Sequence, residues 1–297
     1  MMEWGFACDE SMFREGEGGE SVLPVYLESL VAAGFRWWEV FLHSGFSLGV
    51  IEKIREWSKA YDLCLSLHAR FIGINFAVAH PLLCEAVVGV AEEDLRFAQA
   101  IGAQRIIFHA GSMNWYDIIP SLTHPHHHFF QTRFDSLRLQ FAQATLQNLK
   151  RVVTRVLQYG IQPFVENLYC PWEFPRTPEE MEIFLSVLGK ETGLALDIGH
   201  ALITGHTVEE YLSRLGEHPL HVHFHWNDGQ FDLHRMPPVS EETKKIIEQL
   251  VLRERAVAIL EVSPVENYQA LLEFLPQIRE RIDKKISSSD GLINLVL

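Results

Sequence analysis

The chain has 297 residues, of which 47% are hydrophobic and 22% charged, so it can bury the core of one large globular domain. Its 25 Lys and Arg against 39 Asp and Glu give a formal net charge of −14, which disfavours nucleic acids and anionic membranes as partners. The four cysteines, Cys8, Cys64, Cys84 and Cys170, have no CxxC spacing, as is typical of reduced thiols in a cytosolic protein. With no signal-peptide pattern and no run near the roughly 20 apolar residues of a membrane span, we expect a soluble, cytoplasmic protein.

Short apolar runs alternate with longer amphipathic segments along the whole chain. The expected strands are 3–8, 37–42, 63–69, 105–111, 162–168, 194–200, 220–226 and 257–262. The expected helices are 21–33, 48–60, 82–101, 132–159, 177–189, 207–216, 240–254 and 266–284. Eight βα units in a chain of this length predict a (β/α)8 TIM barrel, an α/β fold that takes up residues 1–297 as a single domain. A doubly wound sheet is the competing architecture, but an acidic loop without GxGxxG follows the first strand.

From the third strand onward, every predicted strand ends in a side chain that can bind a metal. These residues are His68, His109, Glu166, Asp197 with His200, His225, and Glu261. A TIM barrel builds its active site at the carboxyl ends of its strands, where these side chains would meet. A lone histidine on an apolar strand is usually a core residue, whereas the repetition over six consecutive strands indicates a site.

The segment HVHFHWNDGQFDLH, residues 221–234, divides by strand parity. His221, His223 and His225 share the face toward the barrel interior, and only His225 reaches the top. We therefore interpret the two deeper histidines as interior polar groups that support the site rather than as ligands. Asp232 and His234 follow in the loop, where they can fold back over the site as a second pair of ligands.

Carboxylates mixed with imidazoles, without a thiolate, suit Mn, Zn, Mg, Co or Fe(II). Glu166 and Glu261 belong to the fifth and eighth strands, on opposite sides of the predicted barrel. Two carboxylates that flank a metal-held substrate can take a proton from one carbon and return it elsewhere. This arrangement predicts an isomerase or epimerase that acts on a keto sugar, a sugar phosphate or a related polyol.

The sequence resembles the xylose-isomerase-like TIM barrels, which include sugar isomerases, epimerases and the endonuclease-four type of AP endonuclease. The segments that carry the resemblance are AAGFRWWEVFL with Glu39, IIFHAGS, PFVENLY, LALDIGHALITG, HFHWNDG and LEV, in the family's order. In the isomerases and epimerases, the resemblance implies a divalent metal (Mn, Zn, Co or Mg) held by Glu166, Asp197, His225 and Glu261. The two glutamates would also serve as the catalytic acid and base.

The same resemblance implies substrate contacts around that metal. The implied substrate-binding residues are His68, His109, His200, Arg235 and Trp115. Arg235 is only the nearest candidate for an arginine that the family places closer to its ligand histidine. Trp115 would stack on a sugar ring or pack at the barrel rim.

The endonuclease-four type holds three metals with nine residues, and the sequence has a match for each. They are His68, His109, Glu166, Asp197, His200, His225, Asp232, His234 and Glu261. A phosphodiesterase on abasic DNA is therefore the alternative function, although duplex DNA demands basic residues that the loops supply sparsely. The third alternative is a non-enzymatic or dehydratase-like relative that keeps the barrel and one metal.

The partner expected from these observations is a small sugar, without nucleic acid or membrane, and a homodimer is expected only by analogy with the family. The run His124–His128 fits a loose metal site, a proton shuttle or a solvated loop. The acidic segment 14–20 fits either a lid over the site or a loop without that role.

Overall fold

The structure is a computed structural model that describes residues 2–8, 23–43, 48–113, 127–263 and 267–278, with only the backbone described for 127–136. Eight parallel strands form a closed barrel in the order β1-β10-β9-β8-β6-β4-β3-β2. These strands are β1 (Glu3–Cys8), β2 (Trp37–Phe41), β3 (Cys64–His68), β4 (Arg105–Phe108), β6 (Gln162–Glu166), β8 (Gly193–Asp197), β9 (Leu220–Phe224) and β10 (Val257–Leu260). All eight predicted strands are present, and the predicted (β/α)8 barrel is confirmed.

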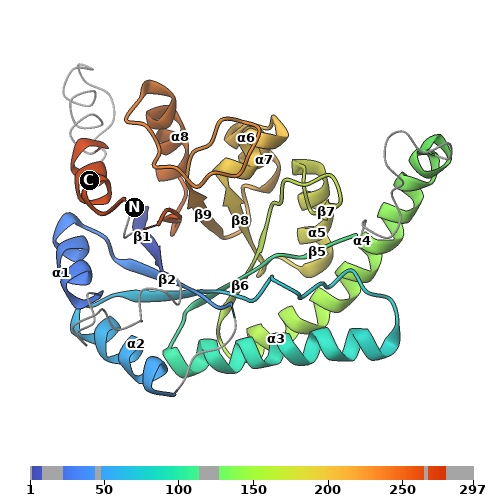
Figure 1. Ribbon diagram of the computed structural model, residues 1–297, viewed down its shortest axis with the longest axis horizontal. Coiled ribbons are helices and arrows are strands. Elements are labelled where there is room, and N and C mark those ends of the chain that lie inside the picture. Colours follow the sequence, from blue (N-terminus) through green and yellow to red (C-terminus); the bar gives the residue numbers. More distant parts are fainter. Residues whose placement is uncertain (1, 9–22, 44–47, 114–126, 264–266, 279–297) are drawn as a thin grey trace.

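Helices surround the barrel and cover the apolar outer faces of the strands (Figure 1). They are α1 (Leu23–Ala33), α2 (Leu48–Ala60), α3 (Pro81–Ile101), α4 (His127–Gln158), α5 (Pro178–Leu188), α6 (Ile198–Thr204), α7 (Val208–Leu215) and α8 (Glu241–Val251), and residues 267–278 are also helical. The long helix α4 packs beside α3, and its first turns extend beyond the barrel. Within the described residues, no helix combines the length and the apolar character that a bilayer crossing requires.

Two of the helices begin at a hydroxyl residue that caps the first turn. Thr177 caps α5 by accepting a hydrogen bond from the backbone of Glu180, and Ser240 caps α8 in the same way with Thr243. At the other side of the barrel, Trp4 packs edge-on against Phe274, with ring centroids 5.7 Å apart. This contact holds the last described helix against the first strand.

Several predicted boundaries were wrong. Strands β4, β6 and β9 end at Phe108, Glu166 and Phe224, before the predicted ends at residues 111, 168 and 226. The predicted strand 194–200 ends at Asp197, because this carboxylate caps α6 by accepting a hydrogen bond from the backbone of His200 at 2.6 Å. The predicted connection 112–131 is shorter than expected, since α4 begins at His127. Two short strands that the sequence reading missed, β5 (Gly111–Ser112) and β7 (Glu173–Phe174), pair antiparallel beside the barrel.

The barrel interior is only partly apolar. Two small clusters fill it, one around Trp37 and Ile259 and the other around Phe164. Buried polar residues lie among them, namely Glu39, Ser66, His221 and His223. Because buried polar groups are costly unless they are paired, the interior must be built as a hydrogen-bonded network.

Candidate functional site

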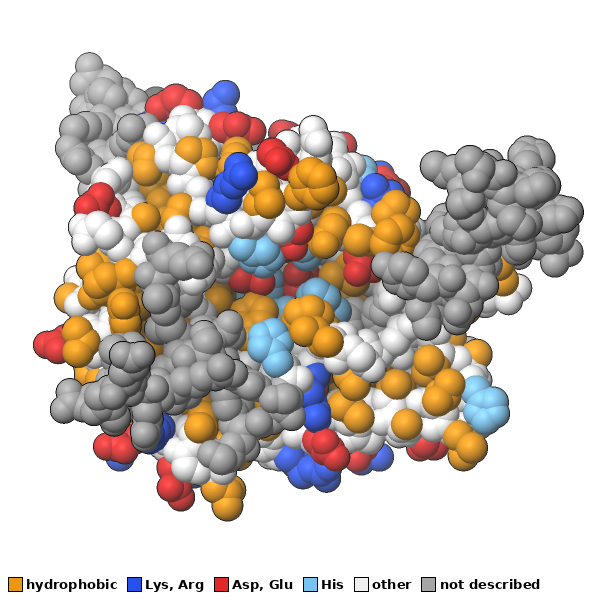
Figure 2. Space-filling view, viewed as in Figure 1, with side chains coloured by type: hydrophobic (Ala, Val, Ile, Leu, Met, Phe, Trp, Pro, Cys, Tyr) orange, Lys and Arg blue, Asp and Glu red, His pale blue; other side chains and the backbone are white. Residues whose placement is uncertain are grey.

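A cavity of about 410 Å³ opens at the carboxyl ends of the barrel strands. Figure 2 shows histidine and acidic side chains gathered in a hollow in the middle of this face. The lining residues are Ala7, Cys8, Phe41, His43, His68, Phe71, His109, Glu166, Tyr169, Glu173, His200, Asp232, His234, Glu261, Val262 and Ser263. The walls are thus largely apolar and aromatic, most of the polar groups converge on the floor, and these described lining residues include no lysine or arginine.

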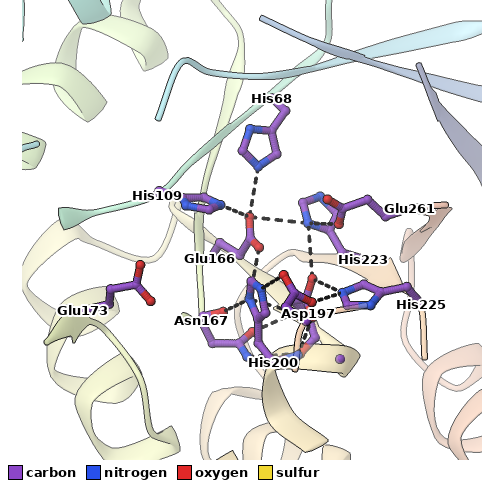
Figure 3. Close-up of polar contacts among 12 residues, drawn as sticks. His68, His109, Glu166, Asn167, Glu173, Asp197, His200, His223, His225 and Glu261 are labelled. Atoms are coloured by element: carbon purple, nitrogen blue, oxygen red, sulfur yellow. Dashed lines mark hydrogen bonds and ion pairs between the residues drawn. The ribbon is translucent and has the colours of Figure 1, made fainter. Parts of the chain in front are cut away.

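The first part of the floor is the Glu166 group, which consists of Glu166, His68 and His109. The Nε2 atoms of both histidines lie 3.2 Å from the same carboxylate oxygen, Oε2 of Glu166 (Figure 3). Phe41 stacks on His68 with ring centroids 4.4 Å apart, and Phe71 stacks on His109 at 4.5 Å. The strand ends bring the three potential metal ligands together, and the aromatic rings hold the imidazoles in place.

The second part is the Asp197 group, which consists of Asp197, His225 and Glu261. His225 Nε2 lies 3.0 Å from Oδ2 of Asp197, and Glu261 approaches from the end of β10. Asn167, the residue after Glu166, accepts a hydrogen bond from the backbone N–H of Asp197 at 2.7 Å and donates one to its carbonyl at 3.1 Å. Asn167 thereby ties the ends of β6 and β8 together beneath the site.

The third part is the Asp232 group, which consists of Asp232, His200 and His234. Oδ2 of Asp232 lies 3.4 Å from Nε2 of His200 and 3.0 Å from Nε2 of His234. The loop that carries Asp232 and His234 folds back because Trp226 and Arg235 pair their backbones at its base. Strand parity alone does not predict this contact between the loop and the barrel.

Gly199 makes room for a donor of the Asp197 group. A Cβ atom at this position would lie 1.9 Å from Cε1 of His225, whose ring packs directly over the glycine and stacks on His234 at 4.1 Å. In the segment DIGH, Asp197 therefore caps the helix, Gly199 leaves room for the His225 ring, and His200 supplies a second imidazole. The sequence reading used Asp197 and His200 but missed the role of the glycine.

Gly199→Ala is expected to displace His225, because a methyl group cannot share the space of its ring. Overpacking of this kind destabilises a protein by about 1–3 kcal/mol, and metal binding should weaken as well. Thermal unfolding and metal titration measure the two effects. The matched control is Gly89→Ala in α3, where nothing lies within 4 Å of an added Cβ and the helix should gain up to about 1 kcal/mol. Equal stability of the two variants would contradict the assignment.

The charges of the site favour ionised carboxylates. Burial raises the pKa of Glu166, but His109 and His223 offset this and hold the pKa well below its usual range. Burial lowers the pKa of His200, yet Asp197 and Asp232 raise it to about 10 overall. This raised pKa favours the protonated form of His200, so metal ions would compete with protons for its ring.

Several buried polar atoms in the site have no hydrogen-bond partner. They are Oδ1 of Asp232, Oε2 of Glu261, Nδ1 of His225 and both ring nitrogens of His223. Some of these atoms form ion pairs with one another, as Nδ1 of His223 does with Oε2 of Glu261, but such a concentration of buried polar atoms without aligned hydrogen bonds indicates that the site binds something. Clusters of oxygen and nitrogen donors without thiolates fit divalent ions such as Zn, Mn, Co or Fe(II).

The structure brings together all nine metal-capable residues of the sequence analysis: seven line the cavity, and Asp197 and His225 are buried in contact with them. Arg235 is exposed and is not among the residues that line the cavity. Its backbone pairs with that of Trp226 at the base of the loop. Trp115, the acidic segment 14–20 and His124–Pro125–His126 lie outside the described residues, and His127 and His128 begin α4. Asn167 and Tyr169 were not predicted as site residues. Asn167 could have been predicted, because it is a polar residue directly after a strand-end ligand.

Comparison with known proteins identifies one family for the sequence and one shared fold for the structure. The family model described as xylose isomerase-like TIM barrel matches residues 27–278. A D-tagatose 3-epimerase-like protein superposes with a TM-score of 0.72 at 20% identity, over 96% of this chain and 100% of its own. The TTHB071 protein of Thermus thermophilus, soaked with ZnCl2, has a TM-score of 0.67 at 23% identity, over 94% and 99%. Endonuclease IV from the same organism has a TM-score of 0.60 at 18% identity, over 94% and 99%. At these identities the structures show a shared fold, not a shared substrate.

Proposed function

This chain belongs to the xylose isomerase-like TIM barrel family, and from that premise we propose that it is a divalent-metal-dependent enzyme that hydrolyses small phosphate esters. The observation that carries the proposal is the closure of the Asp232 group onto the floor formed by the Glu166 and Asp197 groups. A single metal held by four residues has no need of these additional donors. Three adjoining sets of donors instead support a site with several metals.

The donor set fits the ions by its chemistry and by its unpaired atoms. Carboxylate oxygens and imidazole nitrogens of the Glu166, Asp197 and Asp232 groups would hold the ions; the sets whose ligand atoms lie within 4.8 Å of one another include Asp197 with His200 and His225, and His225 with Asp232 and His234. Bound ions would supply the positive charge that polarises a phosphate ester and acidifies a water molecule. The chain's own contribution is to fix the donors, with Phe41, Phe71 and Asn167 holding them in place.

The walls of the cavity indicate the class of ester. The described lining has no lysine or arginine, so these residues offer no cation for charges remote from the floor. Phe41, Phe71 and Tyr169 supply apolar and aromatic surface above the donors. A compact molecule with one phosphate group and an uncharged, partly apolar remainder fits this surface. Duplex DNA fits poorly, because the formal net charge of −14 opposes a polyanion.

Isomerisation or epimerisation of a keto sugar is the second candidate, and one contact favours it. Glu166 and Glu261 approach the same atom, Nδ1 of His223, at 3.4 and 3.1 Å. The two carboxylates therefore face the same point on the floor from different strands. In this function one glutamate would remove a substrate proton and the other would return it.

One set of measurements separates the two candidates. The purified chain is analysed for metals, then assayed with p-nitrophenyl phosphate, bis-p-nitrophenyl phosphate and a panel of ketoses and ketose phosphates. We expect more than one metal per chain and hydrolysis of at least one phosphate ester. One metal per chain, with conversion of a ketose and no hydrolysis, would overturn the hydrolase proposal in favour of the isomerase.

Asp232→Asn tests the third group of donors directly. The change should remove about one metal per chain and lower the hydrolysis rate on the order of 10²-fold or more, since an amide is a poor ligand for a divalent ion. Asp228→Asn in the same loop is the matched control, because Asp228 is exposed and only caps the turn at Gln230 and Phe231. Wild-type metal content in the Asp232 variant would refute the multinuclear site.

A further inference from the structure

The barrel interior contains a buried polar ladder, here the residues Glu39, His221 and His223, that the proposed chemistry does not use. None of the three side chains has measurable solvent exposure. Glu39 occupies the centre, with Oε2 2.9 Å from Nε2 of His221 and Oε1 2.8 Å from Nε2 of His223. Ser66 also donates its hydroxyl to Oε2 of Glu39 at 2.8 Å. Such a buried set of charges is costly to build, so its retention in one ordered network calls for a role.

His223 connects this ladder to the cavity floor. With Nε2 facing Glu39, its Nδ1 lies 3.1 Å from Oε2 of Glu261, 3.4 Å from Oε2 of Glu166 and 3.9 Å from Oδ2 of Asp197. Figure 3 shows the ring between Glu261 and the other carboxylates, with contacts drawn to Glu166 and Asp197. One imidazole therefore touches three carboxylates that come from three different strands.

The ring has little freedom to move away from these carboxylates. The His68 ring lies stacked beside it at 5.6 Å, and the His221 ring meets it edge-on at 5.3 Å. Glu39 restrains its opposite nitrogen from below. The contacts at both ring nitrogens are close but not aligned as hydrogen bonds, and Nδ1 is shared among several carboxylates.

We propose that His223, oriented by Glu39, is a positioning residue that sets the spacing of the Glu166, Asp197 and Glu261 carboxylates for metal binding. The proposal rests on the metal binding in the proposed function, but not on its reaction. His223 contacts one oxygen of each of the three carboxylates, and the other oxygens remain available to bind the ions. Groups that orient metal ligands from behind typically contribute 10- to 100-fold to metal affinity.

His221 provides a matched control within the same ladder. It is as buried as His223, lies on the same strand and contacts the same glutamate. Its other ring nitrogen, however, faces Arg105 at 3.4 Å at the opposite end of the barrel. A change at His221 thus disturbs the interior without removing a contact to the floor.

The test uses the full chain, stripped of metal and titrated with Co²⁺ alone. Calorimetry gives the affinity, the visible absorption bands report the ligand geometry, and circular dichroism confirms the fold. His223→Gln should bind Co²⁺ about 10- to 100-fold more weakly with shifted bands, whereas His221→Gln should stay within about 3-fold of wild type with unchanged bands. Glu39→Gln, which keeps the shape of the side chain, should show the shifted bands in a milder form and serves if His223→Gln does not fold.

The outcomes separate this inference from the proposed function. Wild-type affinity and bands in His223→Gln, or in Glu39→Gln where it replaces that variant, would overturn the positioning role while leaving the proposed function standing. Equal losses in the His223 and His221 variants would also overturn it, because they would reveal only general interior packing. A wild-type chain that binds no Co²⁺ would overturn both proposals.

Discussion

Glu166→Gln is expected to lower kcat/KM for phosphate-ester hydrolysis on the order of 10³-fold or more, a loss of about 4 kcal/mol of transition-state stabilisation. Glu166 contacts several histidines of the site through both of its carboxylate oxygens. Its Oε2 contacts His68 and His109, and its Oε1 lies 3.4 Å from Nδ1 of His200. An amide keeps the shape but loses the charge that neighbouring ions would share.

The measurement is steady-state kinetics on a nitrophenyl phosphate ester, combined with metal analysis of the same preparation. We expect the loss of activity to be accompanied by a loss of bound metal. Glu85→Gln on α3 is the control, since Glu85 is exposed and pairs with Arg151 away from the cavity. A fully active variant with its metals retained would contradict a metal-binding role for Glu166.

Removal of metal is expected to abolish activity and to lower thermal stability. Four carboxylates, Glu166, Asp197, Asp232 and Glu261, lie within one small site, three of them buried in the core and Asp232 partly exposed. An ion present at 100 times its Kd stabilises the folded state by about 2.7 kcal/mol. In a domain of this size that energy corresponds to roughly 5 °C in Tm for each occupied site.

Dialysis against a chelator, followed by calorimetry and assay, measures both effects. Addition of Zn²⁺, Mn²⁺ or Co²⁺ should restore Tm and activity together, and Mg²⁺ should restore less because imidazoles are poor ligands for it. The Asp232→Asn variant should show a smaller change in Tm than wild type, since it would lose fewer ions. An unchanged Tm and full activity after complete chelation would contradict a metal-dependent enzyme.

The barrel itself was predictable from the sequence because its signals are local. A short apolar run bounded by turn residues predicts a buried strand wherever it occurs, and eight such runs define the fold. Placement of ligands at strand ends was predictable for the same reason, since β-strand parity and strand length locate His68, Glu166 and Glu261 at the top. One boundary error arose where a capping residue, Asp197, ended a strand that apolar composition alone would continue.

Local amino-acid patterns were enough to predict the architecture and the chemical type of the site, namely carboxylates and imidazoles at the top of a barrel. Which of these side chains meet depends on how the strands and loops come together in three dimensions. Asp232 and His234 lie in a loop whose path depends on the pairing of Trp226 with Arg235, and no local pattern encodes that path. Strand parity placed His223 in the barrel interior as a polar group behind the ligands, but it did not predict that Nδ1 of this residue contacts three carboxylates from other strands. Local patterns specify the direction of a side chain along its own strand, whereas distances between strands follow from the closure of the barrel.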